Sequence, residues 1–291
     1  MSDAFVLLED GKPTAQARGD LLVPWWSFGK TVIAATALRL VEQGRLSLDQ
    51  GRDGVTLRRL LTHEAGLRDY GGLPDYHRAV AAGATPWSRT EMRGRAKAER
   101  SIFAPGEAWA YSNIGYLTAR ERIEQAFGAG LGEAARDLVF APLDVEGVEL
   151  ALTTDDLDGV RVGTAQGYHP AWVYHGLFVG PLTAAAEVLD GLLGPSSPLS
   201  QASQDLMTRR RELPEHNRPP WALAAYGLGF MCPTTAQGWV AVGHTGGGPG
   251  SVVAVYSRPE GGRRTAAAFS LGEDQSPTEH RVVELLAVGA S

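Results

Sequence analysis

The sequence has one cysteine and only three lysines among its 291 residues. Cys232 has no second cysteine to pair with, so an internal disulfide is excluded, which fits a reducing compartment without requiring one. The lysines are Lys12, Lys30 and Lys97, and the other cationic side chains are arginines. Arginine keeps its proton in proteins, whereas burial can turn a lysine into a base. A lysine beside another reactive side chain therefore indicates chemistry.

The chain also lacks a basic charge excess and long apolar runs. Its formal net charge is −6 at pH 7, which provides no attractive field for nucleic acid or an anionic membrane. No stretch approaches the roughly 20 apolar residues that span a bilayer, and residues 1–6 do not resemble a secretory signal. We therefore expect a cytoplasmic protein without a nucleic-acid or membrane partner. The oligomeric state stays open.

Strand-like and helical segments are unevenly distributed along the chain. Strands are expected at 5–8, 15–18, 226–231, 239–242, 251–256 and 265–270, and helices at 57–61, 75–82, 90–100, 114–127, 131–140, 183–193 and 277–288. Because the strands cluster at the two chain ends, the order favours the α+β class, with an antiparallel sheet built from both ends. We predict a single compact unit, with 1–24 and 220–291 as a sheet lobe, 25–219 as a helical lobe, and any site at their junction.

The stretch 25–31 places Ser27 and Lys30 three residues apart where an apolar helix begins. Residues i and i+3 lie on the same side of a helix, so the lysine amine can reach the serine hydroxyl. Residues 31–41 are apolar on nearly every face, as in a buried helix, and Gly44 is a plausible stop. Ser27 is a candidate nucleophile and Lys30 a candidate base. The alternative is a serine that only caps the helix.

Two other motifs overlap this stretch and fit it poorly. Residues 29–31 match the end of a P-loop, but that motif needs a glycine where Pro24 stands, and Trp25 and Trp26 would crowd the phosphate-binding backbone. A Gly-x-Ser-x-Gly nucleophile elbow would require glycine at Trp25. Neither motif is expected to operate here.

Two polar triplets lie downstream. Tyr111-Ser112-Asn113 precedes an expected helix, where such residues are usually caps. His244-Thr245-Gly246 opens the glycine-rich run 243–250 between expected strands, which predicts either a hairpin loop or a close backbone approach. Each triplet is weak evidence when taken alone.

Two further segments bear on the site. The stretch 60–67 contains His63-Glu64, as in zinc proteases, but Leu67 stands where the second histidine is needed, so no metal site is expected. The irregular stretch 150–181 is rich in aromatics, and Trp172 and Tyr174 are candidate pocket-wall residues. Ordinary surface packing explains those aromatics equally well.

The motifs Ser-x-x-Lys, Tyr-x-Asn and His-Thr-Gly follow one another along the sequence. With these three motifs in this order, the chain resembles the penicillin-recognising serine hydrolase superfamily, and more narrowly its class C β-lactamase, D-aminopeptidase and serine esterase branch. The segment 60–67 resembles the leucine-rich turn near the site of that family. The resemblance implies a β-lactamase/DD-peptidase-like fold and hydrolysis of a small ester or amide, without a cofactor.

The resemblance also implies roles for individual residues. Ser27 would attack a carbonyl and form an acyl-enzyme, with Lys30 and Tyr111 sharing a proton and Tyr111 activating the deacylating water. Asn113 would contact the acyl side chain and Lys30. The oxyanion would lie between the backbone N–H groups of Ser27 and Gly247.

The substrate-binding strand implied by the resemblance contains His244, Thr245 and Gly246. His244 replaces the lysine of Lys-Thr-Gly, and a histidine is largely neutral at pH 7 unless a neighbour raises its pKa. Recognition of a substrate carboxylate is therefore weakened, which favours an esterase or a D-aminopeptidase-like amidase. A true class C-like β-lactamase or DD-peptidase, and a non-catalytic β-lactamase-like binding protein, remain the alternatives.

Overall fold

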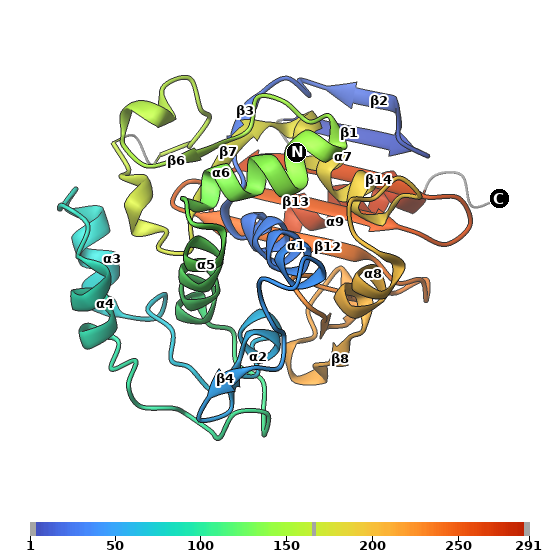
Figure 1. Cartoon of the computed structure of the whole chain (residues 1–291). Helices are drawn as coiled ribbons and strands as arrows, with labels where there is room; N and C mark the ends of the chain where they lie inside the picture. Colours follow the sequence, from blue (N-terminus) through green and yellow to red (C-terminus); the bar gives the residue numbers. More distant parts are fainter. Residues whose placement is uncertain (1–3, 165–166, 288–291) are drawn as a thin grey trace.

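The computed structural model describes residues 4–164 and 167–287, and its centre is a five-stranded antiparallel sheet (Figure 1). The strand order is β12-β13-β14-β1-β2. Its members are β1 (Ala4–Glu9), β2 (Lys12–Ala17), β12 (Val242–Gly248), β13 (Ser251–Arg258) and β14 (Arg264–Leu271). The chain ends meet in this sheet, because β1 pairs with β14 from Ala4 opposite Phe269 to Glu9 opposite Arg264. The predicted α+β class, with a sheet built from both ends, is confirmed.

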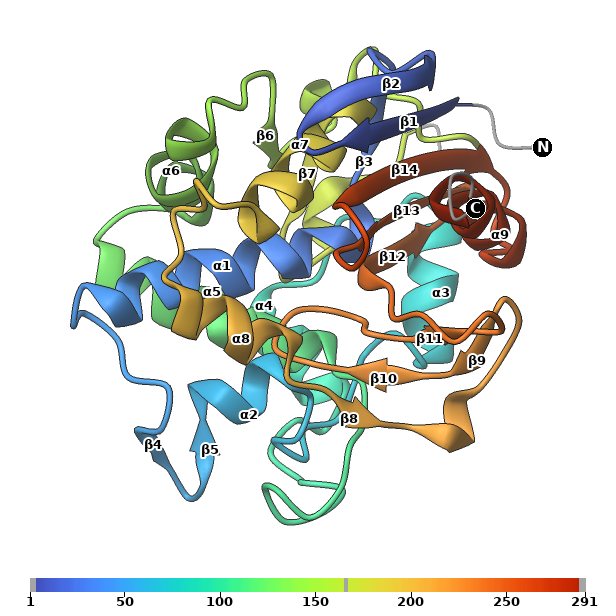
Figure 2. The same cartoon turned by 90° about the vertical axis from the view of Figure 1, so that its right-hand side faces the viewer.

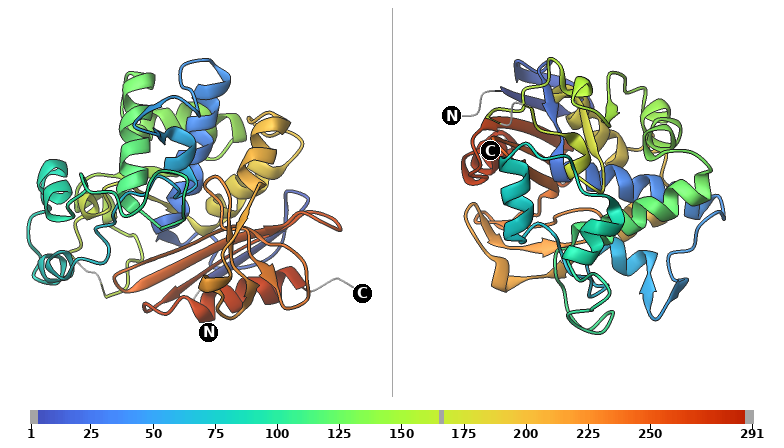
Figure 3. Two further views of the ribbon diagram at one scale, coloured as in Figure 1. Left: turned by 90° about the horizontal axis from the view of Figure 1, so that it is seen from below. Right: turned by 90° about the vertical axis from the view of Figure 1, so that its left-hand side faces the viewer.

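The two faces of the sheet are buried under different helices. Along β13, Val253 and Val255 point into the main core, whereas Ala254 and Tyr256 point to the opposite face. This alternation is the period of a strand. The second face is covered by α9 (Ser276–Ala287), and the first is covered by α7 (Leu182–Leu193) and by the helix Gly29–Glu42 (Figures 2 and 3).

The central helix of the main core is α1 (Gly29–Glu42), in which 11 of 14 residues are buried. It ends as predicted, since Gly44 follows with a left-handed φ of 70°. The remaining helices are α2 (Leu57–Leu61), α3 (Pro74–Ala81), α4 (Arg89–Arg95), α5 (Asn113–Phe127), α6 (Leu131–Ala135) and α8 (Gln201–Thr208). Thr56 caps the N-terminus of α2, because its hydroxyl accepts the N–H of Arg59 at 3.3 Å.

Smaller sheets surround this core. They pair β3 (Leu22–Pro24) and β6 (Glu149–Ala151) with β7 (Leu177–Pro181), β4 (Gly51–Arg52) with β5 (Val55–Thr56), β8 (Arg211–Glu212) with β10 (Ala225–Tyr226), and β9 (Trp221–Leu223) with β11 (Thr234–Thr235). No helix within residues 4–164 and 167–287 is long and apolar enough to cross a membrane. The division into a sheet lobe and a helical lobe stays a prediction.

Several expected elements differ from the structure. The strand expected at 226–231 is limited to the end of β10, because the chain turns at Gly229, where φ is 80°. The segment 239–242 contributes only its last residue to a strand, whereas β12 extends through the glycine run that also predicted a loop. The helix expected at 131–140 is α6 followed by the π-helical turn Arg136–Phe140. Helix α4 stops at Arg95, α8 was not predicted, and Val288 of the last expected helix lies outside the described residues.

Candidate active site

Ser27 lies in a short 3₁₀ turn, Trp26–Phe28, that leads directly into α1. Trp26, the preceding residue, has a left-handed φ of 42°, which is rare for a bulky side chain and requires support from the surrounding structure. Its indole N–H donates to Ser251 Oγ at 3.1 Å, and its ring packs edge-on against Tyr168. These contacts fix the turn that presents Ser27.

The side chains of Lys30 and Tyr111 converge on Ser27. Lys30 Nζ lies 3.1 Å from Ser27 Oγ, and the Tyr111 hydroxyl donates to the same oxygen at 2.9 Å. Lys30 also reaches Asn113 Oδ1 at 2.7 Å. The structure therefore brings together Ser27, Lys30, Tyr111 and Asn113, which the sequence predicts as site residues from two separate segments.

Burial sets the protonation of this group. Lys30 is fully buried, and desolvation lowers its pKa to about 7, although the charge of Asp69 acts in the opposite direction. Burial raises the pKa of Tyr111 above its usual value, an effect that its hydrogen bond to Ser27 reduces. At neutral pH, Tyr111 is therefore a phenol, and a large fraction of Lys30 is an uncharged amine that can accept a proton.

Asn113 is oriented by Asp69. The backbone N–H of Asn113 donates to Asp69 Oδ1 at 2.8 Å, and its Nδ2 lies 3.3 Å from Asp69 Oδ2. This second contact turns the amide oxygen towards Lys30. Burial raises the pKa of Asp69, while the hydrogen bonds from Asn113 and the charge of Lys30 lower it. Ser112 caps α5 by accepting the N–H of Gly115 at 3.0 Å, so the Tyr-x-Asn triplet is both a cap and part of the site.

Strand β12 lies at the edge of the central sheet and forms the opposite side of the site. Successive residues of an antiparallel strand direct their N–H and C=O groups alternately towards and away from the paired strand. Gly243 directs both away from β13, because it exchanges hydrogen bonds of 3.0 and 2.7 Å with Met231. Gly247 lies four residues further along and shares this orientation. A Cβ atom on Gly246 would lie 2.6 Å from the backbone nitrogen of Ser27, so the two backbones meet here.

His244 and Thr245 lie in β12 but do not line the cavity beside Ser27. His244 is fully buried, with Nδ1 2.7 Å from the Thr245 carbonyl and Nε2 3.2 Å from the Tyr226 hydroxyl. Burial, and then the charge of Lys30, lower its pKa to about 3, so the ring is neutral. The Thr245 hydroxyl points to the α9 face and donates to Glu279 at 2.6 Å. Neither side chain faces this cavity, and the binding role implied for them stays a prediction.

A cavity of about 310 Å³ opens at Ser27. Asn113 and Gly247 line it, together with residues that were not singled out by sequence: Trp26, Tyr70, Gly71, Tyr76, His77, Val80, Tyr168, Val173, His175, Gly248, Pro249, Glu273 and Gln275. Trp172 and Tyr174, the expected wall residues, are buried behind this lining, where both pack edge-on against other aromatic rings. No spacing in the sequence connects Tyr70, Tyr168 or His175 with Ser27, so only the fold reveals them.

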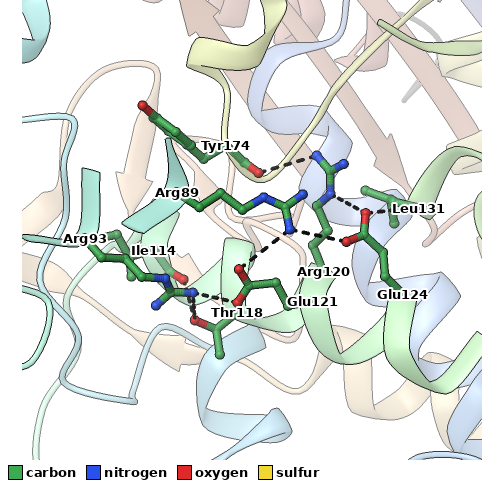
Figure 4. A network of polar contacts seen from close by, with 9 residues as sticks. All are labelled: Arg89, Arg93, Ile114, Thr118, Arg120, Glu121, Glu124, Leu131 and Tyr174. Carbon is green, nitrogen blue, oxygen red and sulfur yellow. Dashed lines mark hydrogen bonds and ion pairs between the residues drawn. The ribbon is translucent and has the colours of Figure 1, made fainter. Parts of the chain in front are cut away.

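The segment that contributes His175 is anchored to α5. Arg120 on α5 reaches the Tyr174 carbonyl at 3.5 Å and pairs with Glu124 at 2.7 Å (Figure 4). The same network ties α4 to α5, because Arg93 donates to Glu121 at 2.7 Å. The cavity wall is therefore held by the helix that begins at Asn113.

Comparison with known proteins gives a consistent set of similarities. The family model described as Beta-lactamase matches residues 2–282. A D-aminopeptidase of Cereibacter sphaeroides is 28% identical over 200 residues, which cover 66% of this chain and 37% of the relative. This chain therefore spans only part of the length of that relative.

Solved structures show the same fold at low identity. The D-amino acid amidase of Ochrobactrum anthropi SV3 complexed with L-phenylalanine superposes with a TM-score of 0.79 at 20% identity, covering 99% of this chain and 94% of that one. The octameric penicillin-binding protein homologue of Pyrococcus abyssi superposes with a TM-score of 0.80 at 19% identity, covering 98% and 72%. The predicted β-lactamase/DD-peptidase-like fold is confirmed.

Proposed function

Because the chain belongs to the beta-lactamase family, we propose that it is a serine hydrolase that cleaves a small amide or ester through an acyl-enzyme on Ser27. The observation that carries the proposal is the pair of contacts at Ser27 Oγ, 3.1 Å from the Lys30 amine and 2.9 Å from the Tyr111 hydroxyl. A serine needs an adjacent base to become a nucleophile, and a lysine with a pKa of about 7 is such a base.

In the proposed acylation, Ser27 Oγ bonds to the substrate carbonyl carbon as its proton passes to the neutral amine of Lys30. The negative charge that develops on the carbonyl oxygen is stabilised by the backbone N–H groups of Ser27 and Gly247. Ser27 lies in the first turn of its helix, where N–H groups have no intrahelical acceptor, and Gly247 points to the outer edge of β12. As the bond to the leaving group breaks, Tyr111 donates its proton to the leaving nitrogen or oxygen.

Deacylation returns both protons. A water molecule attacks the acyl carbon and gives a proton to the Tyr111 phenolate, which the Lys30 ammonium stabilises while it exists. When the ester bond to Ser27 breaks, Lys30 returns its proton to Ser27 Oγ. Tyr111 thus keeps the water-activating role that the resemblance implied, and Lys30 is the base of the acylation step.

The charges near the cavity favour a substrate without a carboxylate. The lining described above includes Glu273 but neither lysine nor arginine. Arg218 reaches Gln275 at 2.8 Å, but its charge is matched by Glu279, which it contacts at 2.7 and 2.9 Å. His244 is neutral. An acyl group that is uncharged, or that carries an ammonium, is therefore preferred over the carboxylate of a penicillin-like substrate.

The names of the relatives suggest the first compounds to test. D-aminopeptidase and D-amino acid amidase both denote hydrolysis next to a D-amino acid, so D-amino acid amides are the leading substrate class. A cytoplasmic location and action on a free small molecule complete the proposal.

Intact-mass analysis after treatment with a fluorophosphonate tests the mechanism. We expect a single covalent adduct in the wild type and none in Ser27→Ala. Absence of the adduct in the wild type would support a non-catalytic binding protein. A panel of D- and L-amino acid anilides, short p-nitrophenyl esters and a chromogenic cephalosporin tests the substrate class. Cephalosporin turnover faster than both other groups would refute the charge argument.

A further inference from the structure

Lys30 has a third polar neighbour besides Ser27 and Asn113. Nε2 of His175 lies 3.2 Å from Lys30 Nζ, in a fully buried contact. His175 is only 3% exposed, yet it forms part of the cavity wall. Burial, and then the charge of Lys30, lower the pKa of His175 well below its usual value, so the ring is neutral. A neutral imidazole has one N–H and one lone pair, and its tautomer decides which of them faces the amine.

The neutral Lys30 amine has two hydrogens and one lone pair for its three neighbours. Asn113 takes one hydrogen, because its Oδ1 faces the amine at 2.7 Å while its Nδ2 is turned towards Asp69. One hydrogen and the lone pair remain for Ser27 and His175. If Nε2 of His175 accepts the hydrogen, the lone pair is directed at Ser27. If Nε2 carries a proton, it occupies the lone pair, and Ser27 loses its base.

The hydrogen bonds of Ser27 favour the first arrangement. Ser27 Oγ already accepts the Tyr111 hydroxyl at 2.9 Å, so its own hydrogen must point to a different acceptor. The lone pair of Lys30, 3.1 Å away, is in position to accept it. After proton transfer, the ammonium has three hydrogens for the same three neighbours, and His175 Nε2 remains an acceptor. A single tautomer, with the proton on Nδ1, therefore satisfies Lys30, Ser27 and Asn113 before and after the transfer, while His175 Nδ1 itself is buried without a well-formed hydrogen bond to any described residue.

The backbone on both sides of His175 keeps the ring in place. The Tyr174 N–H donates to the Tyr70 hydroxyl at 3.3 Å, and the Tyr174 carbonyl accepts from Arg120 at 3.5 Å (Figure 4). On the other side, Gly176 adopts a φ of 114°, and its N–H donates to the Val173 carbonyl at 2.8 Å. This support is expected for a side chain whose orientation matters.

We propose that His175 is a positioning residue that aims the lone pair of Lys30 at Ser27 by accepting a hydrogen of the amine at Nε2. The inference rests on the proposed function of Lys30 as the base. It adds a residue that the Ser-x-x-Lys, Tyr-x-Asn and His-Thr-Gly motifs do not contain.

Other titratable groups surround Lys30 and are unchanged when His175 is replaced. Asp69 raises the pKa of Lys30 through its charge, whereas His63 and His244 are neutral because burial lowers their pKa values. The rings of Tyr111 and Tyr116 lie 4.9 and 5.4 Å from Nζ, and burial raises both phenol pKa values. The positive charge of Arg120 also lowers the pKa of His175. A change in the pH dependence therefore reports on the contact between His175 and Lys30.

The pH profile of kcat/KM for His175→Leu and His175→Gln tests the proposal. Leucine removes the acceptor, so the plateau should fall about tenfold or more, and the acid limb should move to lower pH because the ammonium loses a hydrogen bond. Glutamine offers an amide oxygen at a similar reach and should keep both features close to the wild type. His280→Leu is the control, because His280 lies on α9 outside this cavity and contacts the Ser276 carbonyl at 2.8 Å. That control should leave the kcat/KM profile unchanged.

An unchanged acid limb in His175→Leu, or a His175→Gln variant as impaired as His175→Leu, would overturn the proposal. A second measurement does not depend on activity. Long-range ¹H–¹⁵N spectra of the wild type and of Ser27→Ala report the tautomer of each histidine, and His175→Gln identifies the signal of His175. We expect the proton on Nδ1, and a proton on Nε2 would refute the inference. If the wild type forms no adduct at Ser27, the proposed function is refuted. The position of the proton on His175 is measured separately, so it still supports or refutes the role proposed for His175.

Discussion

Replacing Lys30 with methionine should make the protein more stable, by an amount that depends on pH. The side chain is fully buried, and desolvation lowers its pKa from 10.5 to about 7. Between these two values the unfolded chain holds a proton that the folded protein does not. The contribution of Lys30 to the free energy of unfolding therefore rises with pH in this window, and it is lowest below pH 7. Methionine removes this dependence while keeping an apolar stem of similar length.

The size of the effect follows from the shift. Each pH unit inside the window changes the free energy of unfolding by about 1.4 kcal/mol. From pH 7, where Lys30 is half protonated in the folded state, to pH 9, the wild type should gain about 2 kcal/mol relative to Lys30→Met. The hydrogen bonds lost from Asn113 and His175 offset part of the advantage of methionine at every pH, but they do not change its slope.

Urea unfolding followed by tryptophan fluorescence at pH 7, 8 and 9 measures this difference. Lys12→Met is the matched control, because Lys12 is exposed on β2, and its difference from the wild type should stay constant. Most other titratable groups contribute equally to the free energy of unfolding of the two proteins, so their contributions cancel when variants are compared at the same pH. If the gap between the wild type and Lys30→Met changes by less than about 0.5 kcal/mol between pH 7 and 9, Lys30 has the same charge in both states. The argument for Lys30 as the base would then fail.

Two further substitutions test neighbouring parts of the site. Asp69→Asn removes a charge that raises the pKa of Lys30, so the acid limb of the kcat/KM profile should move to lower pH; a shift to higher pH would contradict the electrostatics. In Gly246→Ala, the new Cβ would lie 2.6 Å from the Ser27 nitrogen and 2.7 Å from the Trp25 carbonyl. The turn and β12 must then separate, and kcat should fall about 100-fold or more, as when an oxyanion donor is lost. Gly94→Ala, which meets nothing within 4 Å, is the control for this loss.

The fold was predictable wherever the periodicity was strong. The apolar run after Lys30 predicts a buried helix, and α1 is the most enclosed helix on the sheet side that contains the site. The short apolar runs at both chain ends predict the strands that pair as β1 and β14. The failures among the strands lie between 226 and 242, where apolar residues are buried by two-residue strands and turns, and burial alone does not distinguish these from longer strands.

The candidate site was predictable only as far as its motifs extend. Ser27, Lys30, Tyr111 and Asn113 follow from spacing and order, because each motif sits at the start of a helix. The position of His175 depends on how the segment after Trp172 is anchored to α5, a contact that no local pattern encodes. The burial that lowers the pKa of Lys30 is likewise a property of the assembled core.

The glycine run in β12 shows most clearly what composition left undecided. Its sequence allows either a hairpin loop or a close backbone approach, and both require glycine. The structure separates the two tasks by position, because Gly250 has the left-handed φ of 85° that the turn requires, whereas Gly246 and Gly248 have no positive φ. A Cβ atom at Gly246 would meet the backbone of Ser27, and one at Gly248 would meet the ring of Trp26 at 2.6 Å. These two glycines are needed because the strand must approach the turn that presents the nucleophile, which makes them part of the site.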